Sequence, residues 1–297
     1  MKIGIIGLGT LGEYYARDFS KFNTKIVVLK NSKLQSSMNK CNLLNKKYKL
    51  NIYPAKNYND FFNKNFDTVL ICSPSNWHLY HLQKSIIKNK NVIIEKPIIT
   101  LNKNLSKKYL INKLNKILSY NKKIYYNLIN EYYAKKYLEL FNNYKFEKKK
   151  FDFIYHTSGV NKNEDIMNDL LPHLFSILDN LLNYNEISNI KKKITLNKNI
   201  IQFYADKCFC NIELIQNSKK QLKFGFDGFI AEREIYEKNE NVKTFLLCKK
   251  INKRIKTNNP LTENIKKIIL TNKKYNKNAE YQKITNNFKK CCDVFYA

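Results

Sequence analysis

Four of the seven glycines in this 297-residue chain lie within its first twelve residues. Gly7, Gly9 and Gly12 follow an apolar run over residues 2–6 and precede a helix-like stretch over residues 13–22. In a dinucleotide-binding turn, the first glycine makes the tight bend, the second lets the backbone approach the pyrophosphate, and the third permits close helix–strand packing. A glycine turn alone is weak evidence, but its place between a strand and a helix is the context that the pattern requires. The opening residues therefore predict a dinucleotide-binding βαβ unit.

The same alternation continues to about residue 127. Short apolar runs predict strands, and the stretches between some of them have helical spacing. Strands that alternate with helices indicate a doubly wound parallel sheet. The expected strands cover residues 2–6, 25–29, 50–53, 67–72, 92–95 and 124–127, and the expected helices cover residues 13–22, 58–63, 77–89 and 105–118.

The rhythm changes after about residue 128. Helices are expected at 132–142, 168–182, 261–270 and 279–291, and strands at 151–155, 192–196, 200–204, 209–215, 221–226, 229–236 and 242–247. Consecutive strands separated by Asn, Lys and Gly turns are typical of an antiparallel sheet. We therefore expect an α/β chain with two domains. A doubly wound Rossmann domain over residues 1–122 is followed by an α+β domain with a mostly antiparallel open sheet over residues 123–297.

The net charge of +30 raises the alternative of a nucleic-acid-binding protein. Only three of the 54 basic residues are arginine, namely Arg17, Arg233 and Arg254. Arginine is the residue that grips phosphate and reads guanine in bidentate fashion, so lysine scattered over the whole chain favours a solvated surface. We expect no specific nucleic-acid partner.

The seven cysteines have no spacing typical of a zinc site, so we expect reduced structural thiols and no metal. The N-terminal apolar run is too short for a signal sequence, and no stretch of about 18 apolar residues occurs elsewhere. The sequence therefore predicts a cytoplasmic protein without membrane contact.

The residues that follow the second strand bear on the choice of cofactor. A carboxylate there binds the ribose 2′-hydroxyl in NAD sites, and a cation there accepts the 2′-phosphate in NADP sites. The chain has Lys30, Asn31 and Ser32 at this place and no carboxylate. This favours NADP slightly over NAD.

Three segments together resemble the Gfo/Idh/MocA oxidoreductases. They are the glycine turn of residues 7–12, the strand and Ser-Pro turn of residues 67–78, and the Glu-Lys-Pro sequence that ends residues 92–97. The resemblance covers most of residues 1–130 and, recognisably, residues 168–179. For the cofactor it implies contacts from Gly7, Gly9, Thr10, Leu11, Gly12, Ser73, Pro74, Ser75, His78, Glu95 and Lys96.

The resemblance also implies a catalytic set of Lys96, Asp169 and His173. The spacing of four places Asp169 and His173 on one helical face. Oxidation of a sugar hydroxyl requires removal of its proton, which a histidine with a pKa near ~6.5 can accept at neutral pH. Lys96 would polarise the developing oxyanion. His81 is expected to pack, and His156 has no expected role.

The chain departs from the family pattern at Leu171, Pro172 and Ser176, and it lacks an arginine within residues 127–132. The substrate class therefore stays broad. The sequence predicts an NAD(P)-dependent oxidoreductase of a sugar, nucleotide-sugar or polyol, working as a homo-oligomer, either a dimer or a tetramer. The alternatives are an imine or thioimide reductase of the same family and a catalytically silent regulatory protein that binds the cofactor.

Overall fold

The computed structural model describes residues 2–22, 24–30, 34–120, 122–216, 218–238, 241–271 and 275–297. The chain divides into two units, each built from two segments. The first unit comprises residues 1–127 and 265–285, and the second comprises residues 128–264 and 286–297. The first unit thus extends past the expected boundary at residue 122 and takes in a segment from the last part of the chain.

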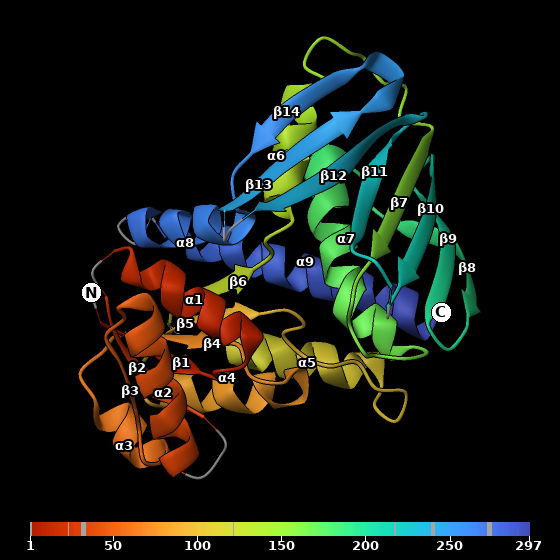
Figure 1. The fold of residues 1–297 in the computed structure, drawn as a ribbon. Coiled ribbons are helices and arrows are strands. Elements are labelled where there is room, and N and C mark those ends of the chain that lie inside the picture. Colours follow the sequence, from red (N-terminus) through yellow and green to blue (C-terminus); the bar gives the residue numbers. More distant parts are fainter. Residues whose placement is uncertain are drawn as a thin grey trace. The chain divides into compact units, whose positions relative to one another are not determined.

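The first unit is a six-stranded parallel sheet with the strand order β3-β2-β1-β4-β5-β6 (Figure 1). The chain starts in the centre, builds outward on one side, and returns to build the other side. Apart from the exposed Lys2 and Lys25, the central strands β1 and β2 are apolar and buried, as strands covered on both faces must be. The strands are β1 (Lys2–Ile6), β2 (Lys25–Leu29), β3 (Ile52–Pro54), β4 (Thr68–Ile71), β5 (Asn91–Glu95) and β6 (Ile124–Asn127).

Helices connect these strands, and one of them was not expected from the sequence. α2 buries only Ser37, Cys41 and Leu44, which recur at helical spacing in an otherwise Asn- and Lys-rich stretch. Two small residues and one leucine are too little apolar signal to reveal the helix. The connecting helices are α1 (Thr10–Ser20), α2 (Leu34–Tyr48), α3 (Tyr58–Asn63), the 3₁₀ turn η1 (Ser75–Trp77), α4 (His78–Ile87) and α5 (Lys107–Leu118).

The late segment of the first unit covers the free edge of β6. The hydroxyl of Tyr275 accepts from the backbone N–H of Ile124 at 3.0 Å and donates to the carbonyl of the same residue at 3.2 Å. The carboxylate of Glu280 accepts from the backbone N–H of Tyr126 at 2.9 Å. Side chains thus satisfy backbone groups that no seventh strand reaches.

The second unit contains an eight-stranded sheet with the order β14-β13-β12-β11-β7-β10-β9-β8. All neighbours are antiparallel except β7 and β10, which run parallel because β7 inserts between strands that come later in the chain. The sheet confirms the expected mostly antiparallel architecture and adds β14. The strands are β7 (Lys150–His156), β8 (Ile187–Ile194), β9 (Lys198–Ala205), β10 (Cys208–Ile215), β11 (Gln221–Phe226), β12 (Phe229–Lys238), β13 (Asn241–Cys248) and β14 (Lys253–Thr257).

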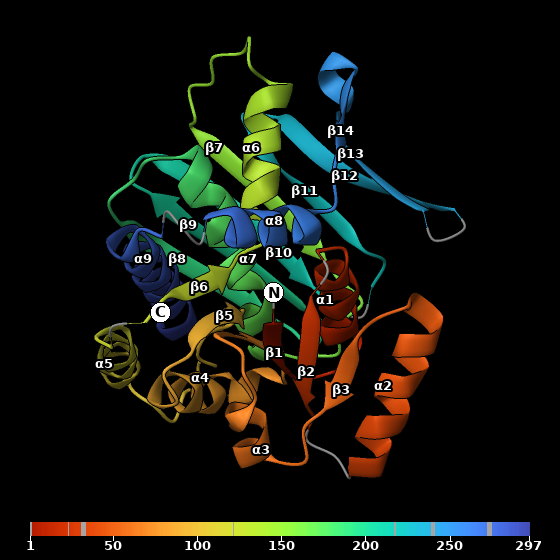
Figure 2. The same ribbon diagram turned by 90° about the vertical axis from the view of Figure 1, so that its left-hand side faces the viewer.

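One face of this sheet packs on α6 (Glu131–Leu140) and α7 (Asp165–Leu181), as Figure 2 also shows. Alternate residues of β7, Phe151, Phe153 and Tyr155, face these helices and are buried. The opposite face, called the outer face below, carries Asp152 and Ile154. The remaining helices are the 3₁₀ turn η2 (Lys249–Ile251), α8 (Pro260–Thr271) and α9 (Lys277–Tyr296).

In the part of the chain that the structure describes, no helix combines the length and the apolar character needed to span a membrane. All seven cysteines are free thiols, and six of them are buried.

Candidate active site

Parallel pairing brings the expected cofactor-binding residues to one edge of the first unit's sheet. Ile6 pairs with Leu29 on one side and with Ile71 on the other, and Ile71 pairs with Ile94. The residues that follow these strands therefore leave the sheet side by side. The boundary between the neighbouring strands β1 and β4 is also the point where the strand order reverses, which is where doubly wound folds bind ligands.

The three glycines of the first turn meet three different surroundings. Gly7 has a φ of +101°, and a Cβ on it would lie 2.6 Å from the backbone nitrogen of Ser73, so the position excludes side chains twice over. A Cβ on Gly12 would lie 2.1 Å from the carbonyl oxygen of Gly7. Gly9 has no atom within 4 Å of its Cβ position. The turn and the helix packing use Gly7 and Gly12, and Gly9 faces open space.

The first turn of α1 has the chemistry of an anion site. Gly9 is the N-cap residue and provides no side-chain cap, so the first amides of the helix have no side-chain acceptor from that residue. Gly9, Thr10 and Leu11 are exposed. Across from this turn, the hydroxyl oxygen of Ser73 is buried without a hydrogen-bond partner. An open helix N-terminus and an orphaned hydroxyl fit the pyrophosphate group of a dinucleotide.

The ribose end of the expected site is only partly described. Asn31 and Ser32 lie outside the described residues. Lys30 follows β2, and its ammonium group lies 3.4 Å from the hydroxyl of Ser36 in the first turn of α2. Lys30, Ser36 and the N-terminus of α2 thus provide a cation, a hydroxyl and backbone amides in one place. Ser36 was not expected from the sequence because the helix that carries it was not.

His78 is held between two loops of this edge. Its Nδ1 lies 2.7 Å from the carbonyl oxygen of Pro97, its Nε2 lies 2.8 Å from that of Ser73, and the side chain is 2% exposed. Burial lowers the pKa of His78, and the charge of Lys96 lowers it further, whereas the two carbonyl contacts oppose this. Both ring nitrogens are occupied by backbone, so His78 serves the cofactor edge by fixing the loops after β4 and β5.

Glu95 lies beneath the same edge rather than on it. Its carboxylate accepts hydrogen bonds from the Tyr15 hydroxyl of α1 and from the Asn127 amide at the end of β6. Burial and the charge of Glu95 raise the pKa of Tyr15, so this hydroxyl keeps its proton and donates. Glu95 therefore braces α1, β5 and β6 next to Lys96, which follows it and is half-buried. Pro74 and Ser75 begin the turn into η1.

The other two expected catalytic residues lie on α7 in the second unit. Asp169 is half-buried and accepts a hydrogen bond from the amide of Gln216, while His173 is 3% exposed. The His173 ring packs edge-on against Tyr155, with 5.3 Å between the ring centroids. Pro172 lies inside the helix, and its carbonyl accepts from the Asn287 amide of α9 at 3.1 Å. The structure thus brings Asp169 and His173 together on one helix, whereas Lys96 belongs to the first unit.

The other two histidines, His81 and His156, make contacts with neighbouring side chains. His81 lies 2.5 Å from the Tyr58 hydroxyl through its Nδ1, and burial lowers its pKa to about 4. His156 lies on the outer face at 2.8 Å from Glu213. Among the described residues, no group of three or more His, Cys, Asp or Glu side chains is arranged to hold a metal ion.

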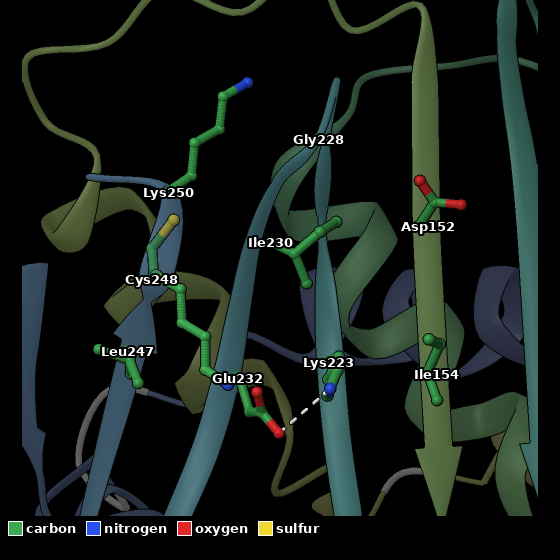
Figure 3. Close-up of a pocket in the computed structure, with 10 residues that line it drawn as sticks. Asp152, Ile154, Lys223, Gly228, Ile230, Glu232, Leu247, Cys248 and Lys250 are labelled. Atoms are coloured by element: carbon green, nitrogen blue, oxygen red, sulfur yellow. Dashed lines mark ion pairs between the residues drawn. The ribbon is translucent and has the colours of Figure 1, made fainter. Parts of the chain in front are cut away.

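A shallow concavity of about 390 Å³ also lies on the outer face (Figure 3). Its floor carries the ion pair between Lys223 and Glu232, at 3.3 Å, together with Ile154 and Ile230. Its acidic groups, Asp152 and Glu232, are both paired with lysines. It therefore has the character of a contact surface rather than of a reaction site.

Comparisons with known proteins agree with this fold. Residues 1–122 match the family model described as an oxidoreductase family with an NAD-binding Rossmann fold, Gfo/Idh/MocA. No curated protein matches the chain by sequence.

Solved structures match almost the whole chain in fold. A UDP-N-acetylglucosamine 3-dehydrogenase from Acidithiobacillus ferrooxidans is 10% identical with a TM-score of 0.67, covering 99% of this chain and 97% of its own. A 3-ketoreductase from Actinomadura kijaniata, in complex with TDP-benzene and NADP, is 8% identical with a TM-score of 0.71, covering 99% and 96%. An oxidoreductase from Thermotoga maritima is 13% identical with a TM-score of 0.68, covering 99% and 96%. Residues 1–122 are therefore similar to the NAD-binding Rossmann domain of the Gfo/Idh/MocA oxidoreductases, and the chain as a whole shares its fold with these solved structures.

Proposed function

We propose that the protein oxidises or reduces one carbon of a sugar by transferring a hydride to or from the nicotinamide of NADP or NAD. Nucleotide-linked sugars are the first substrate class to test. The observation that carries this proposal is the edge where Gly9, Ser73 and Lys96 follow neighbouring parallel strands. The choice of nucleotide-linked sugars is supported by the two structural neighbours that are a nucleotide-sugar dehydrogenase and a 3-ketoreductase bound to a TDP compound.

In this proposal, Lys96, Asp169 and His173 divide the work on the substrate. The nicotinamide, when bound, accepts or supplies the hydride. His173 takes the proton of the sugar hydroxyl during oxidation and returns it during reduction. The ammonium group of Lys96 stabilises the negative charge that develops on the substrate oxygen. Asp169 lies one helical turn before His173 and adds a second polar side chain to the same face of α7.

Cofactor binding can be measured without knowing the substrate. The only tryptophan of the chain, Trp77, is 46% exposed and lies in η1, directly after the Ser73–Ser75 loop. Reduced nicotinamide absorbs where tryptophan emits, so NADPH bound at this edge will quench Trp77. Titration with NADPH and NADH gives both dissociation constants. The absence of quenching and of thermal stabilisation by both cofactors would refute the dinucleotide site.

We further propose that the site prefers NADP, because Lys30 follows β2, where a cation accepts the 2′-phosphate in NADP sites, and the hydroxyl of Ser36 lies beside it. Lys30→Asp should weaken NADPH binding at least about tenfold, or ~1.4 kcal/mol, while NADH binding changes little. Lys25→Asp is the matched control, since it makes the same charge change at the exposed opposite end of β2. An equal loss in both variants would mean that the total charge of the protein, not Lys30, sets the preference.

The catalytic assignment is tested by Lys96→Ala and His173→Ala. Each should lower kcat by about 10²- to 10⁴-fold while quenching of Trp77 by the cofactor persists. Lys88→Ala, on an exposed residue before β5, and His156→Gln, on the outer face, are the controls. Full activity in Lys96→Ala or His173→Ala would refute its role. Tight cofactor binding without turnover of any sugar or imine would favour the regulatory alternative.

We also propose that two copies associate through the outer face. In a chain with a net charge of +30, most surfaces repel a second copy, but here acidic groups are paired with basic ones. These pairs are Asp152–Lys150, Glu213–Lys198, Glu232–Lys223 and Glu234–Arg254. Ile230→Lys should convert an oligomer seen by light scattering into monomers, and Ile235→Lys, which points off this face, should not. A wild-type monomer at about 50 µM would contradict the proposal.

A further inference from the structure

The topology of the second unit places one uncharged side chain next to Asp169. β7 and β10 are the parallel neighbours in the sheet, so their carboxyl ends meet at one edge, with Ile215 paired to His156. The chain after β7 leads into α7, which carries Asp169. The residue directly after β10 is Gln216, and its backbone N–H donates to the Asn197 carbonyl at 3.0 Å. Gln216 therefore lies at the carboxyl end of β10, close to the first turns of α7.

The hydrogen bonds of Gln216 fix which end of its amide faces Asp169. The side chain is fully buried, and its Oε1 accepts from the backbone N–H of Asn161 at 2.7 Å. A backbone N–H can only donate, so the amide oxygen must point toward Asn161. The amide nitrogen consequently points the other way and donates to Oδ2 of Asp169.

A glycine leaves the space that this amide occupies. A Cβ on Gly159 would lie 2.5 Å from Oε1 and 2.7 Å from Cδ of Gln216. The loop between β7 and α7 thus closes over the amide with no room for even a methyl group. Three contacts fix Gln216: its backbone N–H donates to the Asn197 carbonyl, its Oε1 accepts from Asn161, and Gly159 packs against its amide.

We propose that Gln216 is the positioning residue of Asp169. By donating to Oδ2, its amide restricts the carboxyl group of Asp169 to one orientation on the face of α7 that it shares with His173. Gln216 does not touch the reacting atoms and acts through Asp169. The inference rests on the proposed function for its effect on turnover, whereas the contact itself can be tested without any substrate.

The contact is tested by the pH dependence of thermal stability. Gln216→Glu keeps an acceptor for Asn161 but replaces the donor with a second carboxylate facing Asp169. Two carboxylates at this distance repel when both are ionised and share a proton in acid. The Tm difference between wild type and Gln216→Glu should therefore be at least about twice as large at pH 8 as at pH 5. Asp165, His173, Lys162 and Lys219, which lie nearby in the sequence, are unchanged between the two proteins.

Two further variants separate positioning from folding. Gln216→Met removes both hydrogen bonds at similar volume, and Gln202→Met is the matched control, because Gln202 bonds Asn211 at 3.2 Å in the same sheet, away from Asp169. With the sugar that the wild type turns over fastest, Gln216→Met and Gln216→Glu should lower kcat at least about tenfold and leave the KM for the cofactor within about twofold. Gln216→Glu should also move the acid limb of the kcat/KM profile to higher pH, a change that a folding defect does not produce.

A Tm difference that is the same at both pH values would show that the contact is absent and would overturn the inference. A kcat of Gln216→Met equal to that of Gln202→Met would also overturn it, because Asp169 would then be positioned without Gln216. If the wild type turned over no sugar, the proposed function would fail, and the Tm comparison would still decide whether Gln216 holds Asp169.

Discussion

Gly9 and Gly12 lie three residues apart, yet their Cβ positions face opposite surroundings. Gly9→Ala should lower the Tm only slightly, because alanine is a poorer N-cap than glycine but no atom lies within 4 Å of the new methyl group and the φ of −76° suits alanine. The methyl group would stand between the backbone and the pyrophosphate, so cofactor affinity should fall at least about tenfold. Gly12→Ala should instead cost about 2 to 4 kcal/mol of stability, because its Cβ collides with backbone. Thermal melting with and without NADPH distinguishes the two, and a large Tm loss in Gly9→Ala would contradict this prediction.

His81 makes the stability of the protein sensitive to acid. Burial lowers its pKa to about 4, below the ordinary value of 6.5, so the unfolded chain binds a proton there before the folded one does. The stabilisation is therefore complete above pH 6.5 and is lost as the pH falls toward 4. After a discount for partial exposure, it amounts to about 1 to 2 kcal/mol between pH 7.5 and pH 5.

Urea unfolding at the two pH values tests this prediction. His81→Gln should lose less stability on acidification than the wild type does. Identical pH dependence in wild type and His81→Gln would refute the assignment.

At the scale of elements, Asn287 fastens α9 to α7 within the second unit. Its buried amide donates to the carbonyl of Pro172. Asn287→Ala should lower the free energy of unfolding by about 1 to 2 kcal/mol. The adjacent and exposed Asn286 gives the control, since Asn286→Ala changes the same helix without touching α7. Equal stability of the two variants in urea would show that the contact contributes nothing.

Elements with a strong apolar period could be predicted from the sequence. The doubly wound sheet and the mostly antiparallel sheet are both confirmed. Both could be predicted because β1, β2, β4 and β5 are apolar runs and because turns rich in Asn and Lys separate the later strands. α2 was missed because it buries two small side chains and one leucine. β14 was missed because its sequence, Lys-Arg-Ile-Lys-Thr, contains a single large apolar residue.

The surroundings of a candidate site residue could be predicted where a sequence motif determines them. They could not be predicted where tertiary contacts determine them. Gly7 and Gly12 could be assigned their roles from spacing alone. Gln216 and Ser36 could not be, because β10 approaches α7 only through strand pairing, and Ser36 lies on a helix without a sequence signal. The inward direction of Glu95 likewise depends on Tyr15 and Asn127, which are 80 and 32 residues away.

At the scale of the whole molecule, the net charge of +30 opposes folding through self-repulsion. Added salt screens this repulsion, so raising NaCl from about 20 to about 200 mM should raise the Tm. The same increase should abolish binding to duplex DNA, because contacts made by scattered lysines release counterions. Sequence-preferring DNA binding that survives at 200 mM salt would instead support the nucleic-acid alternative.

The return of residues 265–285 to the first unit has a consequence for how the protein is made. The backbone of β6 at Ile124 is bonded by Tyr275, 151 residues later, and that of Tyr126 by Glu280. At about 5 to 20 residues per second, a ribosome exposes this strand edge for roughly 10 to 30 seconds before its partners emerge. The nascent chain therefore exposes an unpaired strand edge through about half of its synthesis, and chains released early will keep this edge open to pairing with one another.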